Sequence, residues 1–186
     1  MTDLPFPRVT ASAAADSSVR AARPQDALGV ADVQLAVWRA AYADVLPEVV
    51  DLDRDDVAEQ WGRSIADAVS SHHLVLVALE GPDVVGFLVA APLPEDARPA
   101  QGEIADLLVH PEHTRRGHGS RLLAASVDLL RQRGDREVLT WCGQDDAPRR
   151  TFLESAGFAA DGVRRTLDMG PGTPALSELR LTALLD

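Results

Sequence analysis

The stretch HPEHTRRGHGSRLL, residues 110–123, decides the fold. It follows an apolar run that stops at a proline, and it leads into an apolar pattern with helical spacing. Arg115 and Arg116 precede two glycines, Gly117 and Gly119. The first N–H groups of a helix have no internal partners, and glycines let an anion approach them closely. The residues alone fit two interpretations, an anion-binding turn and a purely structural turn between a strand and a helix.

Apolar runs on the N-terminal side of this stretch predict strands. GEIADLLV (102–109) reads as a strand that His110-Pro111 ends, because a residue before proline favours extended geometry. HLVLVALE (73–80) and VVGFLVAAPL (84–93) are rich in Val and Leu and flank the turn sequence GPD, which predicts a buried hairpin. SVRAARP (18–24) predicts a first strand.

Helical spacing of apolar residues predicts four helices. The first has Asp26 as its expected N-cap and ends before Pro47, and the second runs from Asp53 to about Val69. The third follows the glycines and ends at Gly134. The remaining expected elements are a strand at 137–143, a helix at 147–157 and strands at 162–169 and 176–185. The resulting order predicts one α/β domain with a mixed sheet over residues 18–186, after a flexible tail of residues 1–17.

Composition excludes several classes of protein. The 186 residues carry 29 acidic and 18 basic side chains, a formal charge of −11, which disfavours nucleic-acid binding and suits cationic partners or simple solubility. Cys142 is the single cysteine, so neither a disulfide nor a cysteine zinc site can form within one chain. We see no membrane-length apolar run and no signal peptide, and therefore expect a cytoplasmic protein with no membrane partner.

Two common phosphate motifs do not match. The chain has no G-x-x-x-x-G-K-[ST], and GHGSRL lacks the third glycine of a dinucleotide fingerprint. The pair IADLLVHPEHTRRGHGSRLL and APRRTFLESAGF instead resembles the GNAT superfamily of acyl-CoA N-acyltransferases, over about Val19 to Leu185. The resemblance implies a GNAT-like fold, with helices on both faces of a mixed central sheet, and acetyl-CoA as co-substrate without a metal.

The resemblance also assigns residues to the coenzyme. It implies that main-chain amides of the turn hold the pyrophosphate and that the end of the preceding strand pairs with the pantetheine arm. The residues it implies for the coenzyme are Leu107, Leu108, Val109, Arg115, Arg116, Gly117, His118, Gly119, Ser120, Asp146 and Phe152. Three positions depart from the family pattern. Thr114 replaces Gln or Arg, Asp146 replaces Asn, and Leu153 replaces the Tyr assigned as general acid.

Glu103 is the expected general base, because acyl transfer to an amine requires a proton acceptor and the resemblance implies an acid at this point of the strand. A two-residue period places Glu103 on one face with Leu107 and Val109, and Asp106 on the other face. Asp106 is the alternative base, and a solvated strand-end carboxylate is the structural interpretation of Glu103.

Other polar and aromatic residues favour structural interpretations. The five histidines show no metal-ligand spacing, and Cys142 lies in an apolar run that favours a buried thiol. Trp38, Tyr42 and Trp61 either line an acceptor pocket or pack in the core.

The sequence therefore predicts an acetyl-CoA-dependent N-acetyltransferase. Its acceptor is the primary amine of a small molecule or peptide, which attacks the thioester directly. Both a monomer and a homodimer are compatible with the sequence. A non-catalytic acyl-CoA-binding or sensing module is the main alternative. A nucleotide-binding regulatory domain is a third hypothesis.

Overall fold

A computed structural model of the chain describes residues 17–43, 51–67, 73–91, 93, 100–168, 170, 173 and 175–185. Its helices and strands follow one another in the order that the sequence predicts. They are β1 (Ser17–Ala21), α1 (Ala27–Tyr42), α2 (Arg54–Asp67), β2 (Leu74–Glu80), β3 (Asp83–Ala91), β4 (Gln101–Val109), α3 (His118–Arg133), β5 (Glu137–Gly143), α4 (Ala147–Ser155), β6 (Ala159–Leu167) and β7 (Leu176–Leu184). The expected tail falls on residues 1–16, which lie outside the described residues, and on Ser17, which begins β1.

The seven strands form one mixed sheet in the order β1-β2-β3-β4-β5-β7-β6. Every neighbouring pair is antiparallel except β4 and β5, which are parallel. The parallel pair joins an N-terminal half, β1 to β4, to a C-terminal half, β5 to β7. The chain crosses between these halves through α3, as a parallel connection requires.

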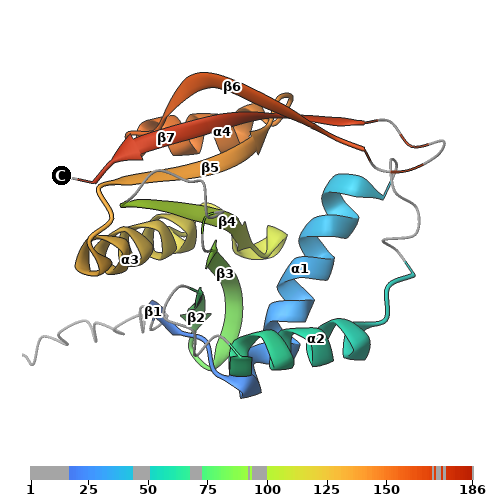
Figure 1. Cartoon of the computed structure of the whole chain (residues 1–186). Coiled ribbons are helices and arrows are strands. Elements are labelled where there is room, and N and C mark those ends of the chain that lie inside the picture. The colour runs from blue at the N-terminus through green and yellow to red at the C-terminus, as the bar shows by residue number, and fades with distance from the viewer. Residues whose placement is uncertain are drawn as a thin grey trace, which may run out of the picture.

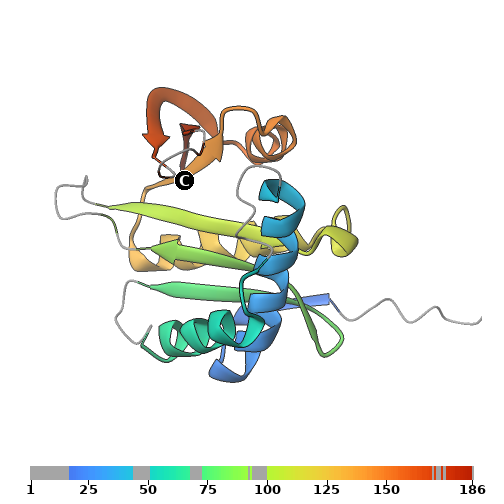
Figure 2. The same ribbon diagram turned by 90° about the vertical axis from the view of Figure 1, so that its right-hand side faces the viewer.

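Helices cover both faces of the sheet, as Figures 1 and 2 show. One face packs α1 and α2 on a core whose members are Val30, Val33, Val77, Leu79 and Phe87, with Trp61 against it. The other face packs α3 and α4 on a larger core that includes Leu122, Leu130, Leu153, Leu179 and Leu181. Trp61 meets Phe87 edge-on at 5.1 Å between ring centroids, so Trp61 belongs to the core. No described helix is long and apolar enough to span a bilayer.

Local sequence signals account for most element ends. Asp53 Oδ1 accepts hydrogen bonds from the amides of Asp55 and Asp56 and so caps α2. Gly134 ends α3 in the left-handed conformation, with φ of 96°. Asp26 occupies the N-cap position of α1 as expected, but its carboxylate makes no capping hydrogen bond there. It instead accepts hydrogen bonds from the Arg20 guanidinium at 2.6 and 2.9 Å and from the Arg23 amide at 2.7 Å.

The strand expected at 162–169 begins earlier, at Ala159. The pairing of β6 with β7 is interrupted between Ala160 and Arg164, and Gly162 lies in this interruption with φ of 89°. The glycine therefore marks an irregularity within the strand, which the sequence pattern took for its start.

Candidate active site

The quoted stretch folds as a strand end, a turn and a helix. β4 ends at Val109, residues Pro111–His113 form one turn of 3-10 helix, and α3 begins at His118. Gly117 occupies the N-cap position of α3 with φ of 82° and offers no side-chain cap. The first amides of α3 therefore lack the side-chain acceptor that usually satisfies one of them, as an anion-binding helix start requires.

The sign of the backbone φ angle alternates along the turn. Arg115 has φ of 62°, which is strained for a residue with a side chain, and Gly117 again has positive φ, whereas Arg116 between them does not. Alternation of this kind directs successive N–H groups to one side and forms a concave anion site. Strain at Arg115 costs on the order of 1 kcal/mol, and such strain is characteristic of functional turns.

Three arginines surround the turn. Arg115 is exposed and makes no hydrogen bond or ion pair with any described residue. Arg121 donates a hydrogen bond from Nη1 to the Arg116 carbonyl oxygen at 3.3 Å, and its guanidinium lies 3.6 Å from where a Cβ on Gly117 would stand. Sequence reasoning missed Arg121. Its spacing of four residues from Gly117, one helical turn, is the signal that could have found it.

Glu80 ties the turn to the end of β2. Its carboxylate accepts hydrogen bonds from Arg116 Nη1 at 3.1 and 3.2 Å, and its Oε2 lies 2.8 Å from His113 Nδ1. The hydrogen bond from His113 and the charge of Arg116 hold the pKa of Glu80 below its ordinary value. Glu80 also was not predicted, because 33 residues separate it from His113.

The two halves of the sheet separate beside this turn. β4 and β5 pair only from Gln101 opposite Glu137 to Ile104 opposite Thr140, where the Thr140 hydroxyl also donates to the Ile104 carbonyl at 2.8 Å. Beyond that point β4 continues along β3 and β5 continues along β7, so the two strands diverge (Figure 1). We call the opening between residues 105–109 and 141–143 the strand split.

The main chain of residues 107–109 therefore has one unpaired edge. Leu107, Leu108 and Val109 pair with β3 on one side, and no strand among the described residues pairs with their other side. An extended ligand can add itself to such an edge through main-chain hydrogen bonds. The edge leads directly to the turn.

A β-bulge at Ala105 corrects the predicted faces of β4. Ile104 lies opposite Ala90 and Asp106 opposite Val89, so Ala105 is the extra residue. The bulge reverses the alternation, and Glu103 and Asp106 consequently lie on the same face, that of α1. Leu107 lies on the other face, against the core beneath α3. The predicted placement of Glu103 with Leu107 and Val109 was therefore wrong.

Burial makes both carboxyl groups better proton acceptors than an exposed carboxylate. Burial raises the pKa of Glu103 above its ordinary value, and Arg165 opposes part of this effect. Burial also raises the pKa of Asp106, opposed by Arg149 and reinforced by Glu178. A carboxylate with a raised pKa accepts a proton more readily, so either residue can act as a base.

Tyr42, Arg149 and Glu178, from α1, α4 and β7, lie within electrostatic range of Asp106. Tyr42 at the end of α1 is half-buried, which raises the pKa of its phenol, and Arg149, Glu178, Asp146 and Asp106 all act on it electrostatically. Glu178 binds Arg165 at 2.6 Å, and the Arg165 guanidinium stacks 4.1 Å from the Trp141 ring centroid. Arg149 buries an Nε that has no described hydrogen-bond partner. The site therefore combines two acids with cations, a phenol and an aromatic ring.

A groove between α3 and α4 adjoins the turn. It has a volume of about 430 Å³, and its lining includes Ser120, Leu123, Val127 and Phe152. A Cβ on Gly119 would lie 3.6 Å from the Phe152 ring and 3.8 Å from Val109. The structure thus brings Val109, Gly119, Ser120 and Phe152, all expected at the coenzyme, into one neighbourhood.

Residues 35–158 match the family model described as "Acetyltransferase (GNAT) family". The chain belongs to this family. It is 25% identical over 175 residues to an uncharacterized N-acetyltransferase, YuaI, of Bacillus subtilis (strain 168), a match that covers 88% of this chain and 96% of that protein.

Solved structures share the GNAT fold. A ribosomal-protein-alanine N-acetyltransferase from Brucella melitensis aligns with a TM-score of 0.73 and 19% identity, over 90% of this chain and 99% of that one. The PaiA N-acetyltransferase of Thermoplasma acidophilum, solved in complex with coenzyme A, aligns with a TM-score of 0.70 and 17% identity, over 90% and 98%. The family and the named relatives make this GNAT protein an acyltransferase enzyme.

Two of the residues expected to depart from the GNAT pattern have clear local roles. Leu153, expected at the position of the family tyrosine, is 2% exposed within the core beneath α3 and α4 and is therefore a packing residue. Asp146 caps α4, because its Oδ1 accepts a hydrogen bond from the Arg149 amide at 3.0 Å. Cys142 is buried as expected, and burial raises the pKa of its thiol, which makes it a poor nucleophile.

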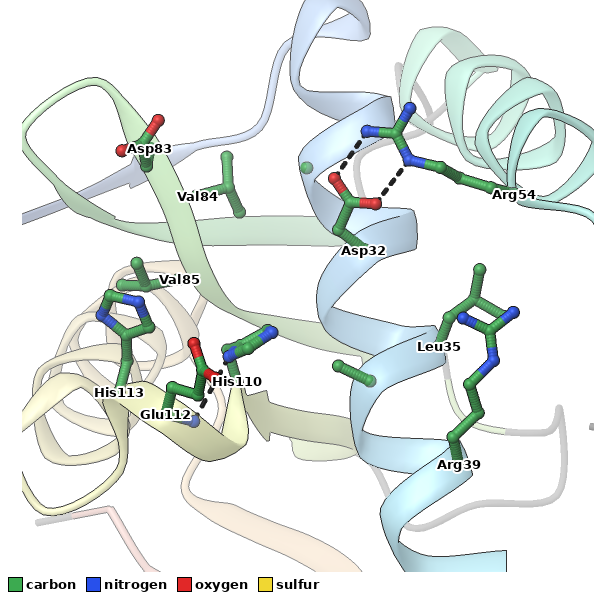
Figure 3. Close-up of a pocket in the computed structure, with 12 residues that line it drawn as sticks. Asp32, Leu35, Arg39, Arg54, Asp83, Val84, Val85, His110, Glu112 and His113 are labelled. Carbon is green, nitrogen blue, oxygen red and sulfur yellow. Dashed lines mark hydrogen bonds and ion pairs between the residues drawn. The ribbon is translucent and has the colours of Figure 1, made fainter. Parts of the chain in front are cut away.

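A separate pocket of about 520 Å³ lies on the α1 side of the sheet, between α1 and the segment that follows β4 (Figure 3). An ion pair between Asp32 and Arg54, at 2.5 and 2.7 Å, borders it on the α1 and α2 side. His110 and His113, which follow β4, border the other side. None of its lining residues comes from β5, α4 or β7, so this GNAT enzyme has a second concavity beside the turn.

Proposed function

We propose that the chain transfers an acetyl group from acetyl-CoA to the primary amine of a small molecule or peptide. The observation that carries the proposal is the continuity of an unpaired strand edge, residues 107–109, with a concave turn of main-chain amides, residues 115–120. An extended pantetheine arm matches the edge, and a pyrophosphate matches the turn.

The coenzyme contacts follow from this placement. Amides of Arg115, Arg116, Gly117, His118, Gly119 and Ser120 hold the pyrophosphate, and main-chain groups of Leu107, Leu108 and Val109 bind the pantetheine arm. The groove that Ser120 and Phe152 line receives another part of the coenzyme. Asp146, which caps α4, also contacts the coenzyme from the start of that helix.

The reaction that this arrangement supports is direct aminolysis of the thioester. The amine nitrogen attacks the carbonyl carbon, the carbon–sulfur bond breaks, and the coenzyme leaves as a thiolate. The amine proton passes to Glu103, directly or through water, and Asp106 is the alternative acceptor because it shares that face of β4. Buried Cys142 is unsuited to carry the acetyl group, which favours attack without a covalent enzyme intermediate.

Charge favours a cationic acceptor. The chain carries a formal charge of −11, and Glu103, Asp106 and Glu178 gather about the split. Such a field attracts amines in their protonated form. The base must then remove a proton before attack.

Two measurements test this function. Calorimetry with acetyl-CoA tests binding, and release of free thiol with a panel of primary amines tests transfer. Acetylated product with at least one amine is the expected result. Coenzyme binding without thiol release from any amine would favour a non-catalytic acyl-CoA-binding module, which the core position of Leu153 supports. Binding of ATP or NAD in place of acetyl-CoA would reject both.

A further inference from the structure

Three potential metal ligands meet behind the turn. Glu80 ends β2, His113 belongs to the 3-10 helix, and His118 begins α3. One ligand atom from each of these side chains lies within 4.8 Å of the other two. The closest approaches are 2.8 Å from His113 Nδ1 to Glu80 Oε2 and 3.4 Å from His118 Nε2 to the same oxygen.

His118 is the member that requires an explanation. It is 2% exposed, and neither of its ring nitrogens makes a hydrogen bond within the described part of the chain. A buried polar group without a partner is unfavourable, because it has lost its bonds to water. The ring nevertheless has Nε2 near the Glu80 carboxylate, at a distance too long for a good hydrogen bond.

We propose that Glu80, His113 and His118 bind a divalent transition-metal ion, with Zn²⁺ as the best match. Two imidazole nitrogens and one carboxylate oxygen are characteristic ligands of Zn²⁺, Co²⁺ and Ni²⁺, whereas Mg²⁺ and Ca²⁺ favour oxygen ligands alone. Bonds of about 2.0–2.1 Å in a tetrahedral site separate neighbouring ligand atoms by about 3.3 Å. The 3.4 Å between His118 Nε2 and Glu80 Oε2 matches that separation.

Small movements complete the site. The metal takes the place of the proton between His113 Nδ1 and Glu80 Oε2, and these two atoms move apart by about 0.5 Å to reach the tetrahedral separation. Arg116, whose side chain is 54% exposed, also binds Glu80 and must turn away from it. Glu80 and His113 keep 20% and 30% of their side-chain surface exposed, which gives the ion a route in and a fourth position for water.

Spacing along the sequence could not reveal this group. The two histidines stand five residues apart in a turn, and their carboxylate partner lies on a strand 33 residues before His113. The expectation that the chain binds no metal rested on histidine spacing, on the single cysteine and on the GNAT resemblance. The fold supplies the third ligand.

Titration of the untagged, metal-free chain with Co²⁺ tests the proposal without any coenzyme. We expect one Co²⁺ per chain, with the intense visible absorption of a tetrahedral ion, and displacement by Zn²⁺ but not by Mg²⁺. His113→Ala and His118→Leu should each weaken Co²⁺ binding at least about tenfold. His118→Leu replaces the buried ring with an apolar side chain of similar size, and circular dichroism checks its fold.

His110→Ala is the matched control. Its ring lies only 5.7 Å from that of His113 between centroids, yet it is not among the three clustered ligands. This variant should bind Co²⁺ as the parent does. The proposal is overturned if the parent shows no tetrahedral absorption, or if His113→Ala binds Co²⁺ as tightly as the parent. The His113 variant decides the matter even where His118→Leu does not fold, since His113 is partly exposed.

Discussion

Glu103 and Asp106 point to the same face of β4 although three positions separate them, because Ala105 bulges from the ladder between them. A regular strand would have placed one acid toward α1 and the other toward α3. The bulge instead offers two carboxyl groups with raised pKa to one side of the strand split. Because Glu103 and Asp106 share this face, either of them can be the general base, and mutation of each one distinguishes the two.

Glu103→Gln tests the favoured base. The amide cannot accept the amine proton, so we expect kcat/KM to fall by roughly 10²–10⁴ while the affinity for acetyl-CoA, measured by calorimetry, stays within twofold. Asp106→Asn is the matched comparison on the same face. Near-normal turnover of Glu103→Gln together with a large loss in Asp106→Asn would transfer the role of base to Asp106.

Asp106→Asn should also change stability in a pH-dependent way. Burial raises the pKa of Asp106 in the folded chain above its unfolded value, so between these two values the folded state binds more protons. Stability contributed by this group is therefore present at low pH and falls as pH rises through that window. We expect Asp106→Asn to melt at a higher temperature than the parent at pH 7. The difference should shrink below the ordinary carboxyl pKa of about 4, and a lower melting temperature at pH 7 would contradict it.

The sequence predicts the order of elements because its turn signals and apolar periods agree with the fold. Asp53, Gly134 and His110-Pro111 end or begin elements where the pattern placed them. The bulge at Ala105 has no composition signal, so a two-residue period assigned the wrong face to Leu107 and Val109. Asp26 shows a related limit: an acid before a helix fits a cap, yet the packing of Arg20 beside it gives the carboxylate another partner.

The candidate site likewise contains residues that the sequence predicted and residues that it did not. The turn and the strand edge are local in sequence, so the resemblance located them from contiguous residues. Glu80, Arg149 and Glu178 reach the turn or the split from separate elements. Nothing in their neighbouring residues distinguishes them from ordinary surface charges, so sequence reasoning missed them.

Glycine substitutions in the turn separate backbone strain from ligand contact. Gly117→Ala should lower the free energy of unfolding by about 1–2 kcal/mol, because an alanine in the left-handed region is strained. Gly119→Ala is the control: its Cβ meets Phe152 and Val109 at ordinary contact distances, so we expect normal stability and coenzyme binding. Chemical denaturation compares the two, and equal stability would contradict the strain.

Gly119→Val adds two methyl groups to a Cβ position that already lies 3.6 Å from the Phe152 ring, beside the groove proposed for the coenzyme. We expect acetyl-CoA binding to weaken at least tenfold, about 1.4 kcal/mol, in a variant that still folds. Calorimetry measures the loss, with Gly119→Ala as the matched reference. Unchanged affinity in folded Gly119→Val would place the pyrophosphate elsewhere.

Arg115→Ala removes a cation that has no described protein partner. Its melting temperature should therefore equal that of the parent, since Arg115 is exposed and alanine keeps the same backbone strain at this positive φ. Acetyl-CoA binding should weaken severalfold, and the difference should shrink as salt screens the phosphate charge. Arg63→Ala, at an exposed position of α2 on the opposite face of the sheet from α3, is the control for net charge. An equal loss of acetyl-CoA affinity in the two variants would show that Arg115 acts only through long-range electrostatic attraction.

The leaving thiolate should not require a tyrosine. Leu153 is enclosed in the core, and Tyr42 is the single tyrosine of the chain. Thiols have pKa values of roughly 8.5, so their anions leave readily once the amine has attacked. We expect Tyr42→Phe to keep kcat nearly unchanged and kcat/KM to rise with pH, as the base and the amine deprotonate, without a fall near pH ~10.

The contrary result for Tyr42 is specific. Tyr42 lies within electrostatic range of Asp106 and Arg149, and burial raises the pKa of its phenol, so a limb that it controls would fall above its ordinary value of about 10. A basic limb present in the parent and absent in Tyr42→Phe would identify Tyr42 as the acid. Leu153→Tyr cannot substitute for this test, because a larger side chain in the closed core should destabilise the fold by about 1–3 kcal/mol. Such a variant would not show whether a tyrosine at this position can protonate the leaving thiolate.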